Sequence, residues 1–255
     1  MRSFHSFLLF TGLVLCGMQP VYADSTNNIG KSLANPSRSD ADRERDVRDK
    51  PQDVLELAGF KKGMVIADVF GGGGYYSEIL SRVVGPKGRV LLLNNAPYDK
   101  YAKKEIGPRL ADKRLPNVEY RVVPNDDLGL RVNSLDGALI VMSYHDLFYA
   151  DAENGWPAID SRQFMAQIVA GLKPGSRLLI VDHSAKAGAA ASDTKTLHRI
   201  EEQYALSELR SYGLEWVGSI AVLRNPADDR SLSVFDPAIK GRTDRFVHVY
   251  LKPEN

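Results

Sequence analysis

Short apolar runs alternate with segments of helical periodicity along most of the chain. The apolar runs predict seven strands, at residues 64–67, 89–93, 118–123, 135–142, 177–181, 214–223 and 245–251. Between them, apolar residues recur at helical spacing and predict helices at residues 52–59, 75–84, 98–112, 162–172 and 194–212. Strands that alternate with helices are typical of an α/β domain with a largely parallel sheet.

The last two predicted strands are separated only by a loop, residues 224–244. A parallel pair needs a crossover connection, so these two strands should pair antiparallel. The sequence therefore predicts a seven-stranded, mostly parallel sheet whose last strand is antiparallel, with helices on both faces. One such domain is expected over residues 51–255.

A glycine cluster joins the first strand of this domain to its first long helix. The strand ends near Asp68, and the helix opens with Tyr75 and Tyr76. The connection contains four consecutive glycines: Gly71, Gly72, Gly73 and Gly74. Glycine allows positive φ and a close approach of the backbone to a ligand, and the helix that follows offers free N–H groups. The cluster therefore predicts a tight turn that contacts a ligand.

Polar residues follow five successive predicted strands. They are Asp68, Asn94, Asn95, Asp126, Asp127, Ser143, His145, Asp146, Asp182 and His183. Ligands of open α/β sheets bind outside the carboxyl ends of the strands, so these residues predict a binding crevice. Taken singly, each has a structural alternative: an aspartate can cap a turn or a helix, an asparagine can form a turn, and the tyrosines can belong to the core.

The two histidines are the candidates for acid–base chemistry. His145 stands beside Asp146, and His183 stands beside Asp182 after the next strand, so the rings should lie near each other if these strands are neighbours. A histidine oriented by a carboxylate can act as a general base, and His145 is the first candidate. Neither pair has the i, i+4 spacing of a helical metal site, and no metal is predicted.

Several common enzyme classes are excluded by motifs that the chain lacks. No Gly-Lys-Ser/Thr follows the glycines, so they form no phosphate loop, and no Gly-x-Ser-x-Gly provides a serine nucleophile. The third glycine of a dinucleotide fingerprint would fall on Tyr76. The turn from Asp68 to Gly74, together with Lys173-Pro174-Gly175 before the fifth strand, resembles the Rossmann-like S-adenosylmethionine-dependent methyltransferases.

A closer resemblance covers nearly all of the chain after residue 23. The chain looks like a group of predicted, often exported, bacterial methyltransferases, on motifs at residues 72–76, 144–146, 182–183 and 241–246. The resemblance implies that S-adenosylmethionine is the cofactor and that a small molecule is the methyl acceptor. It implies catalytic roles for His145, Asp146 and His183.

The resemblance also implies which strand ends contact each part of the cofactor. Asp68 and the four glycines would face its amino-acid portion, Asn94 or Asn95 its ribose, and Asp126 or Asp127 its adenine, with Tyr75, Tyr76 and Ser143 as further candidate contacts. Two positions depart from the family pattern. Phe70 occupies the position of the first family glycine, and the second strand ends without the acid that grips the ribose hydroxyls.

Composition places these features in an ordinary globular chain of 255 residues, with 44% hydrophobic residues and a formal net charge of +1. This charge balance indicates neither a nucleic-acid nor a membrane-surface partner. The sequence does not indicate an oligomeric state.

The first 23 residues differ from the rest. Arg2, an apolar stretch at residues 7–18 and small residues at Val21 and Ala23 predict a signal peptide cleaved after Ala23, and hence a periplasmic or secreted protein. Residues 24–50 are polar and charged, and form either a solvated leader with a charged helix or a lid over the glycine turn. Because the cofactor is made in the cytosol, export also leaves open a second function, that of a non-catalytic small-molecule-binding protein on the same fold.

Overall fold

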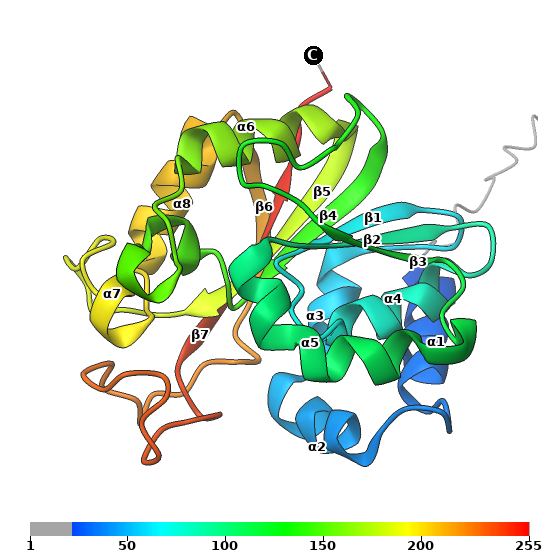
Figure 1. The fold of residues 1–255 in the computed structure, drawn as a ribbon, viewed down its shortest axis with the longest axis horizontal. Helices are drawn as coiled ribbons and strands as arrows, with labels where there is room; N and C mark the ends of the chain where they lie inside the picture. Colours follow the sequence, from blue (N-terminus) through cyan, green and yellow to red (C-terminus); the bar gives the residue numbers. More distant parts are fainter. Residues whose placement is uncertain (1–21, 255) are drawn as a thin grey trace, which may run out of the picture.

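A single seven-stranded sheet organises the protein, whose computed structural model describes residues 22–254 (Figure 1). The strands are β1 (Val65–Val69), β2 (Arg89–Asn94), β3 (Val118–Val122), β4 (Leu135–Val141), β5 (Leu172–His183), β6 (Glu215–Ile220) and β7 (Arg245–Leu251). Their order is β3-β2-β1-β4-β5-β7-β6, with β1 to β5 parallel and β7 antiparallel to both β5 and β6. The predicted sheet, including its antiparallel last strand, is confirmed.

Helices cover both faces of the sheet. They are α1 (Tyr22–Leu33), α2 (Asp40–Asp49), α3 (Pro51–Ala58), α4 (Tyr75–Val84), α5 (Ala96–Leu110), α6 (Ser161–Gly171), α7 (Thr194–Leu197) and α8 (Glu202–Ser211), with short 3-10 turns at Ala111–Lys113, His145–Phe148 and Ala152–Asn154. Side chains alternate along each strand, so β1 sends Ile66 into a core with α3 and α4 and sends Ala67 into a core with α6 and α8. Both faces of the central strands are therefore buried.

Two predicted elements differ from the structure by more than small shifts at their ends. Strand β5 begins at Leu172 rather than at residue 177, because Leu172 still pairs with Leu135 of β4 across a register shift. The helix predicted over residues 194–212 is broken into α7 and α8. Between them, the N–H of Ile200 donates to the carbonyl of His183 and its carbonyl accepts from the N–H of Ala185, at 3.0 and 2.9 Å. The backbone of Ile200 thus pairs with the segment at the end of β5 instead of continuing the helix.

The N-terminal segment is folded onto the domain rather than being a solvated leader. Helix α1 packs on α4, where Ile29 is buried and the hydroxyl of Ser32 donates to the carbonyl of Ile79 at 2.8 Å. Helix α2 crosses from α4 and α5 toward β7 (Figure 1). The predicted signal peptide lies almost entirely outside the described residues, and no described helix is long and apolar enough to cross a membrane.

Charged contacts hold α2 in place. Asp42 pairs with Arg109 of α5 at 2.7 Å, and Asp49 pairs with Arg245 of β7 at 2.8 Å. The only branched apolar side chain of α2, Val47, is 71% exposed. Helix α2 is therefore attached to the domain by ion pairs and hydrogen bonds, without an apolar face of its own.

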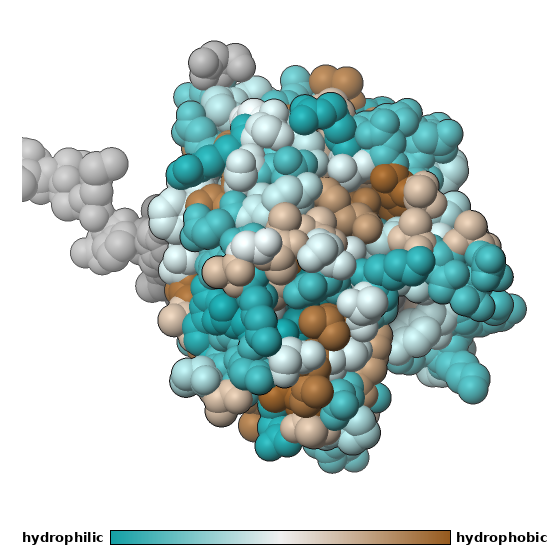
Figure 2. Space-filling view, turned by 90° about the vertical axis from the view of Figure 1, so that its left-hand side faces the viewer, coloured by the Kyte–Doolittle hydropathy of each residue, from teal (hydrophilic) through white to brown (hydrophobic). Residues whose placement is uncertain are grey.

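The side of the molecule that carries α7 and α8 is predominantly hydrophilic. Figure 2 shows hydrophobic residues on this side in small separate patches among polar ones.

Candidate active site

The glycine cluster forms the turn between β1 and α4. Left-handed φ values alternate along it, at 51° for Phe70, 55° for Gly72 and 79° for Gly74, which is the N-cap of α4. Glycine adopts this conformation without steric cost, whereas a bulky residue such as Phe70 does so only where its surroundings enforce it. The predicted strand-turn-helix is confirmed, and helix α4 has the predicted bounds.

The carboxylate of Asp68 lies directly beneath this turn. A Cβ on Gly71 would stand 2.5 Å from the Asp68 carboxyl carbon and from a methyl group of Leu92, so only glycine fits at this position. Asp68 accepts a hydrogen bond from the hydroxyl of Ser77 at 2.7 Å. Burial raises the pKa of Asp68 to about 6, and the hydrogen bond from Ser77 offsets only part of this effect. Asp68 therefore stabilises the turn by packing against Gly71 and by its hydrogen bond with Ser77 of α4.

The two asparagines after β2 are bonded to the protein itself. The side-chain amide of Asn94 accepts from the N–H of Gly72 and donates to its carbonyl, both at 3.0 Å. Asn95 caps α5 by accepting from the N–H of Tyr98 at 3.0 Å, and it donates to Asn125. In the structure these side chains support the turn and cap a helix, and the ribose contact expected of Asn94 or Asn95 stays a prediction.

Several other predicted cofactor contacts lie away from the turn's open side. Tyr75 and Tyr76 are buried in the core, and the hydroxyl of Tyr75 donates to Asp46 of α2 at 2.6 Å. Ser143 is buried. Asp127 accepts from a backbone N–H two residues on and is exposed. None of these four residues lines the cavity at the turn.

Asp126 lines a different, smaller cavity of about 330 Å³ at the end of β3. This cavity also includes Asn125, the partner of Asn95, and Ile159. The adenine contact proposed for Asp126 stays a prediction.

A cavity of about 540 Å³ opens beside the glycine turn, at the carboxyl ends of β1, β4 and β5. Its walls comprise Arg45, Phe70, Gly71, Gly72, Gly73, Tyr98, Tyr101, Glu105, Val141, Met142, His145, Asp146, Tyr149, Trp156, His183, His198, Val234 and Phe235. The predicted crevice is thus present, and it brings together the three candidate catalytic residues and three of the four glycines. A second cavity, of about 450 Å³, lies near Phe60 and Lys173 and contains none of them.

His145 is held by two carboxylates. Asp182 at the end of β5 accepts from the backbone N–H of His145 at 2.7 Å and lies 2.8 Å from its Nδ1, while Asp146 lies 3.3 Å from its Nε2. Burial alone would lower the pKa of His145, but Asp146 and Asp182 outweigh it and raise that pKa to about 9. His145 is therefore oriented by Asp182 from the neighbouring strand as well as by the adjacent Asp146. Its imidazole is doubly protonated and positively charged at neutral pH.

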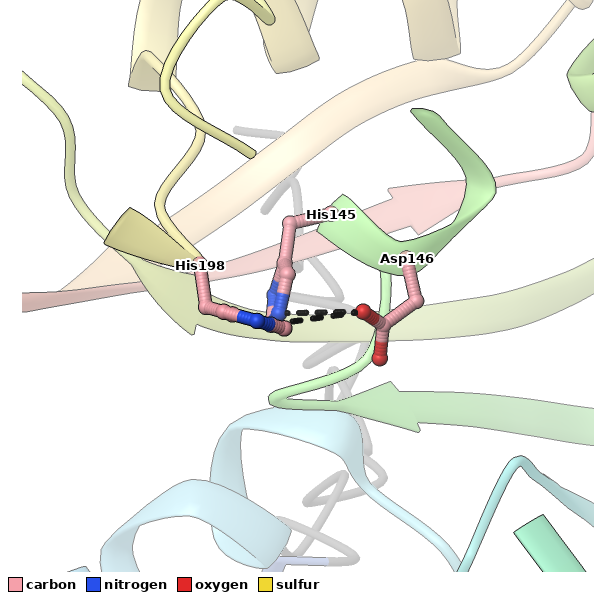
Figure 3. Close-up of side chains that lie close together, drawn as sticks. All are labelled: His145, Asp146 and His198. Atoms are coloured by element: carbon pink, nitrogen blue, oxygen red, sulfur yellow. Dashed lines mark ion pairs between the residues drawn. The ribbon is translucent and has the colours of Figure 1, made fainter. Parts of the chain in front are cut away.

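A third histidine, His198, completes the cluster around Asp146. Its Nδ1 lies 3.7 Å from the carboxylate oxygen of Asp146 that also faces His145, as the dashed lines of Figure 3 show. Tyr98 donates its hydroxyl to the other oxygen of Asp146. Burial would raise the pKa of Asp146, but His145 and the hydrogen bonds from His198 and Tyr98 lower it, so this carboxylate is charged.

His183 lies on the far side of His145, with ring centroids 6.1 Å apart. The two rings are neighbours because β4 and β5 pair in parallel, as the sequence suggested. The Nδ1 of His183 is 2.7 Å from the hydroxyl of Thr243. Burial and the positive charges of His145 and Arg245 hold the pKa of His183 well below its usual range. This imidazole is therefore neutral, in contrast to the charged ring of His145.

The arrangement of the elements is shared with known enzymes. An S-adenosylmethionine-dependent methyltransferase from Aquifex aeolicus superposes with a TM-score of 0.57 at 20% identity, over 89% of this chain and 98% of that one. The chain has the class I, Rossmann-like methyltransferase fold. The geranyl diphosphate C-methyltransferase of Streptomyces coelicolor, whose structure contains S-adenosyl-L-homocysteine, superposes with a TM-score of 0.56 at 12% identity over 87% of each chain.

Sequence relatives point in the same direction. The ubiquinone/menaquinone biosynthesis C-methyltransferase UbiE of Pseudomonas putida is 32% identical over 132 residues, which is 51% of this chain. The chain spans about half, 46%, of that relative's length. No protein-family model matches. The resemblance to Rossmann-like methyltransferases that the motifs indicated is confirmed.

Within this methyltransferase fold, most of the side chains that line the cavity were not predicted from the sequence, among them His198, Tyr98 and Glu105. His198 lies in a segment whose pattern reads as continuous helix. Tyr98 and Glu105 belong to α5, and only its packing shows that Tyr98 reaches Asp146 and that the Glu105 carboxylate lies against Gly73. Tyr98 could have been predicted as a cavity residue, because it follows the second strand and the helix cap at Asn95, and this end of the strand faces the crevice.

Proposed function

We propose that the protein is an S-adenosylmethionine-dependent methyltransferase that acts on a small molecule. The observation that carries this proposal is a single cavity shared by the glycine turn and the cluster of His145, Asp146 and His183. In the methyltransferase fold the turn supports cofactor binding, so the adjoining polar cluster supports an acceptor site. The relatives named above support the same activity.

The residues at the turn fit the cofactor. A cavity of about 540 Å³ lies within the range of about 300–1,000 Å³ that is usual for small-molecule sites. Gly71, Gly72 and Gly73 expose backbone to it, and the carboxylate of Glu105 beside Gly73 would attract a cationic ligand. S-adenosylmethionine, when bound, supplies an electrophilic methyl group on a cationic sulfonium. Glu105 would thus contribute a negative charge next to the glycine turn.

The chain's own contribution is mainly to orient the acceptor and to exclude water. Tyr98, Trp156 and Tyr149 pack edge to face along one wall, with ring centroids 5.6 and 5.9 Å apart, and they form a rigid apolar surface for a flat or apolar acceptor. Alignment of two reactants alone can supply effective molarities of about 10⁵ M or more. Where the acceptor must lose a proton, the neutral ring of His183 is positioned to accept it.

Titration of the purified protein with S-adenosyl-L-homocysteine tests the proposal. Calorimetry and the melting temperature report binding directly and need no acceptor. Gly73→Val adds a branched side chain to the cavity wall, where its Cβ must displace Glu105, whereas Gly107→Val adds the same group on exposed α5 with no atom within 4 Å of the new Cβ. We expect Gly73→Val to abolish binding and Gly107→Val to leave it intact.

The absence of heat and of any melting shift at millimolar S-adenosylmethionine and S-adenosyl-L-homocysteine would contradict the methyltransferase proposal. Equal binding by the Gly73 and Gly107 variants would contradict the location of the cofactor at the turn. Mass spectrometry of ligands retained by the native protein then identifies the acceptor class.

We propose further that residues 1–23 direct export to the periplasm or beyond and are then removed. Arg2, the apolar stretch at residues 7–18 and the small residues before Asp24 support this proposal. Fractionation of cells that express a carboxyl-terminally tagged chain, followed by amino-terminal sequencing, is the test. We expect a periplasmic protein that begins at Asp24; an uncleaved cytosolic chain would contradict export.

We also propose that α2 acts as a lid on the cavity. Arg45 of α2 reaches the cavity wall, 4.0 Å above the ring of Tyr75, and the helix is attached by ion pairs rather than by apolar burial. Hydrogen exchange of Asp40–Asp49 with and without S-adenosyl-L-homocysteine is the measurement. Slower exchange in the complex supports a lid, and identical exchange contradicts it.

A further inference from the structure

Three metal-binding side chains converge in the cavity. The Nε2 of His145, a carboxylate oxygen of Asp146 and the Nδ1 of His198 all lie within 4.8 Å of one another. Figure 3 shows that they come from two segments: His145 and Asp146 from the turn after β4, and His198 from the end of α7. Two imidazoles and one carboxylate form a frequent ligand set of transition-metal sites.

The spacing of the three donors suits an ion at their centre. With metal–ligand bonds of about 2.0–2.2 Å, the donors of a tetrahedral site stand about 3.4 Å apart. His145 and Asp146 already have this spacing at 3.3 Å, and His198 and Asp146 are 3.7 Å apart. To complete the site, the ring of His198 has to shift by a few tenths of an ångström; its side chain is 22% exposed and packs against the rings of Tyr149 and Phe235.

Two of the three candidate ligands have hydrogen-bond partners that would orient them toward a metal ion. Asp182 lies 2.8 Å from the Nδ1 of His145 and holds a proton on that nitrogen, so an ion that binds at Nε2 displaces only the proton there. Tyr98 donates to the Asp146 oxygen that faces away from the cluster, which leaves the other oxygen for the ion. Such outer partners orient ligands in established sites, and their loss typically costs about 10–100-fold in metal affinity.

The local charge also favours a cation. The carboxylates of Asp146 and Asp182 are both buried, and both lie within hydrogen-bonding or ion-pair distance of His145. A buried pair of carboxylates is costly without compensating positive charge. A divalent ion between His145, Asp146 and His198 would take over the compensation that the charged ring of His145 provides through its pairs with both carboxylates.

We propose that His145, Asp146 and His198 bind a divalent transition-metal ion of the Zn²⁺ class, with a further coordination position open to the cavity. Three protein ligands leave room for water or for an oxygen of a bound small molecule. The ion would draw an acceptor with an anionic oxygen, such as an enolate or phenolate, next to the glycine turn. Metal binding itself does not depend on methyl transfer, so the site goes beyond the function proposed above.

Calorimetric titration of the protein with Zn²⁺, after removal of any histidine tag, is the experiment. We expect one ion per chain for the unaltered protein and a loss of about 100-fold or more in affinity for His198→Ala. His198 is chosen because it is partly exposed and its removal should leave the fold intact. His248→Gln is the matched control, because His248 also faces a carboxylate, that of Glu202 at 2.8 Å, but lies outside the cavity.

Visible spectroscopy with Co²⁺ gives an independent readout. Three protein ligands in a low-coordinate site produce strong d–d absorption, which His198→Ala and Asp146→Asn should both abolish while their melting temperatures show that they are folded. The absence of any binding to the unaltered protein at millimolar Zn²⁺, or equal binding by His198→Ala, would overturn the proposal.

The same samples are titrated with S-adenosyl-L-homocysteine in parallel. Cofactor binding without metal binding overturns only the metal site, and metal binding without cofactor binding overturns only the methyltransferase proposal.

Discussion

Phe70 combines a strained backbone with a buried side chain. Its φ is 51°, and its ring is 4% exposed, stacked on Tyr98 at a centroid distance of 4.6 Å and packed on Phe164 at 5.0 Å. Replacement by alanine removes the ring and retains the Cβ that makes positive φ unfavourable. Replacement by glycine removes both. The two variants together separate the strain from the packing.

The loss of a buried phenyl ring costs about 3–5 kcal/mol, so both variants should be less stable than the unaltered protein. A left-handed conformation costs a residue with a Cβ about 1–2 kcal/mol, which glycine avoids. We therefore expect Phe70→Gly to be more stable than Phe70→Ala by about 1 kcal/mol. At positions with ordinary φ the order is reversed, because glycine loses about 0.5–1 kcal/mol more in chain entropy on folding.

Urea denaturation followed by circular dichroism measures the free energies of unfolding. Phe164→Ala and Phe164→Gly serve as controls, because Phe164 is fully buried within helix α6 and touches the same ring. Glycine should be the worse substitution at residue 164 and the better one at residue 70. If glycine is the worse substitution at both positions, the reasoning about strain at Phe70 is refuted.

Three further predictions concern buried charge and the turn. Arg45 and Arg245 hold the pKa of Asp49 at about 2, although burial alone would raise it. The contribution of this carboxylate, about 2 kcal/mol, is therefore complete above about pH 4 and is lost as the pH falls toward 2, so acid titration of stability should show a smaller loss over this range in Asp49→Asn. Arg199→Met leaves Asp228 buried and unpaired and should cost about 3–5 kcal/mol in urea denaturation, with Asp228→Leu added to it restoring part of the loss. Gly71→Ala should cost about 1–3 kcal/mol by overpacking, whereas Gly107→Ala should not destabilise.

The strand, turn and helix from Val65 to Val84 could be predicted from the sequence because local interactions dominate there. The apolar run, the glycines and the helix stop at Gly85 all favour the same structure. The antiparallel β7 followed from the absence of a predicted crossover helix between the last two strands. Such agreement between local preference and fold is what makes an element predictable.

The roles of Asn94 and Asn95 could not be predicted from the sequence in the same way. An asparagine at a strand end suits a ligand contact and a turn equally well, and which one prevails depends on whether a backbone group faces it. In the folded chain Gly72 faces Asn94, and the N–H of Tyr98 faces Asn95.

By itself, the sequence determined the α/β sheet, the glycine turn and the presence of polar groups at the carboxyl ends of the strands, because these depend on periodicity and on the conformational freedom of glycine. Only the tertiary structure decided that Asp182 orients His145 and that His198 joins the cluster. The pattern of residues 194–212 favours continuous helix, but the pairing of Ile200 with the chain after β5 and the burial of Arg199 outweigh that local preference. The break turns His198 toward Asp146, and the composition of the candidate site follows from it.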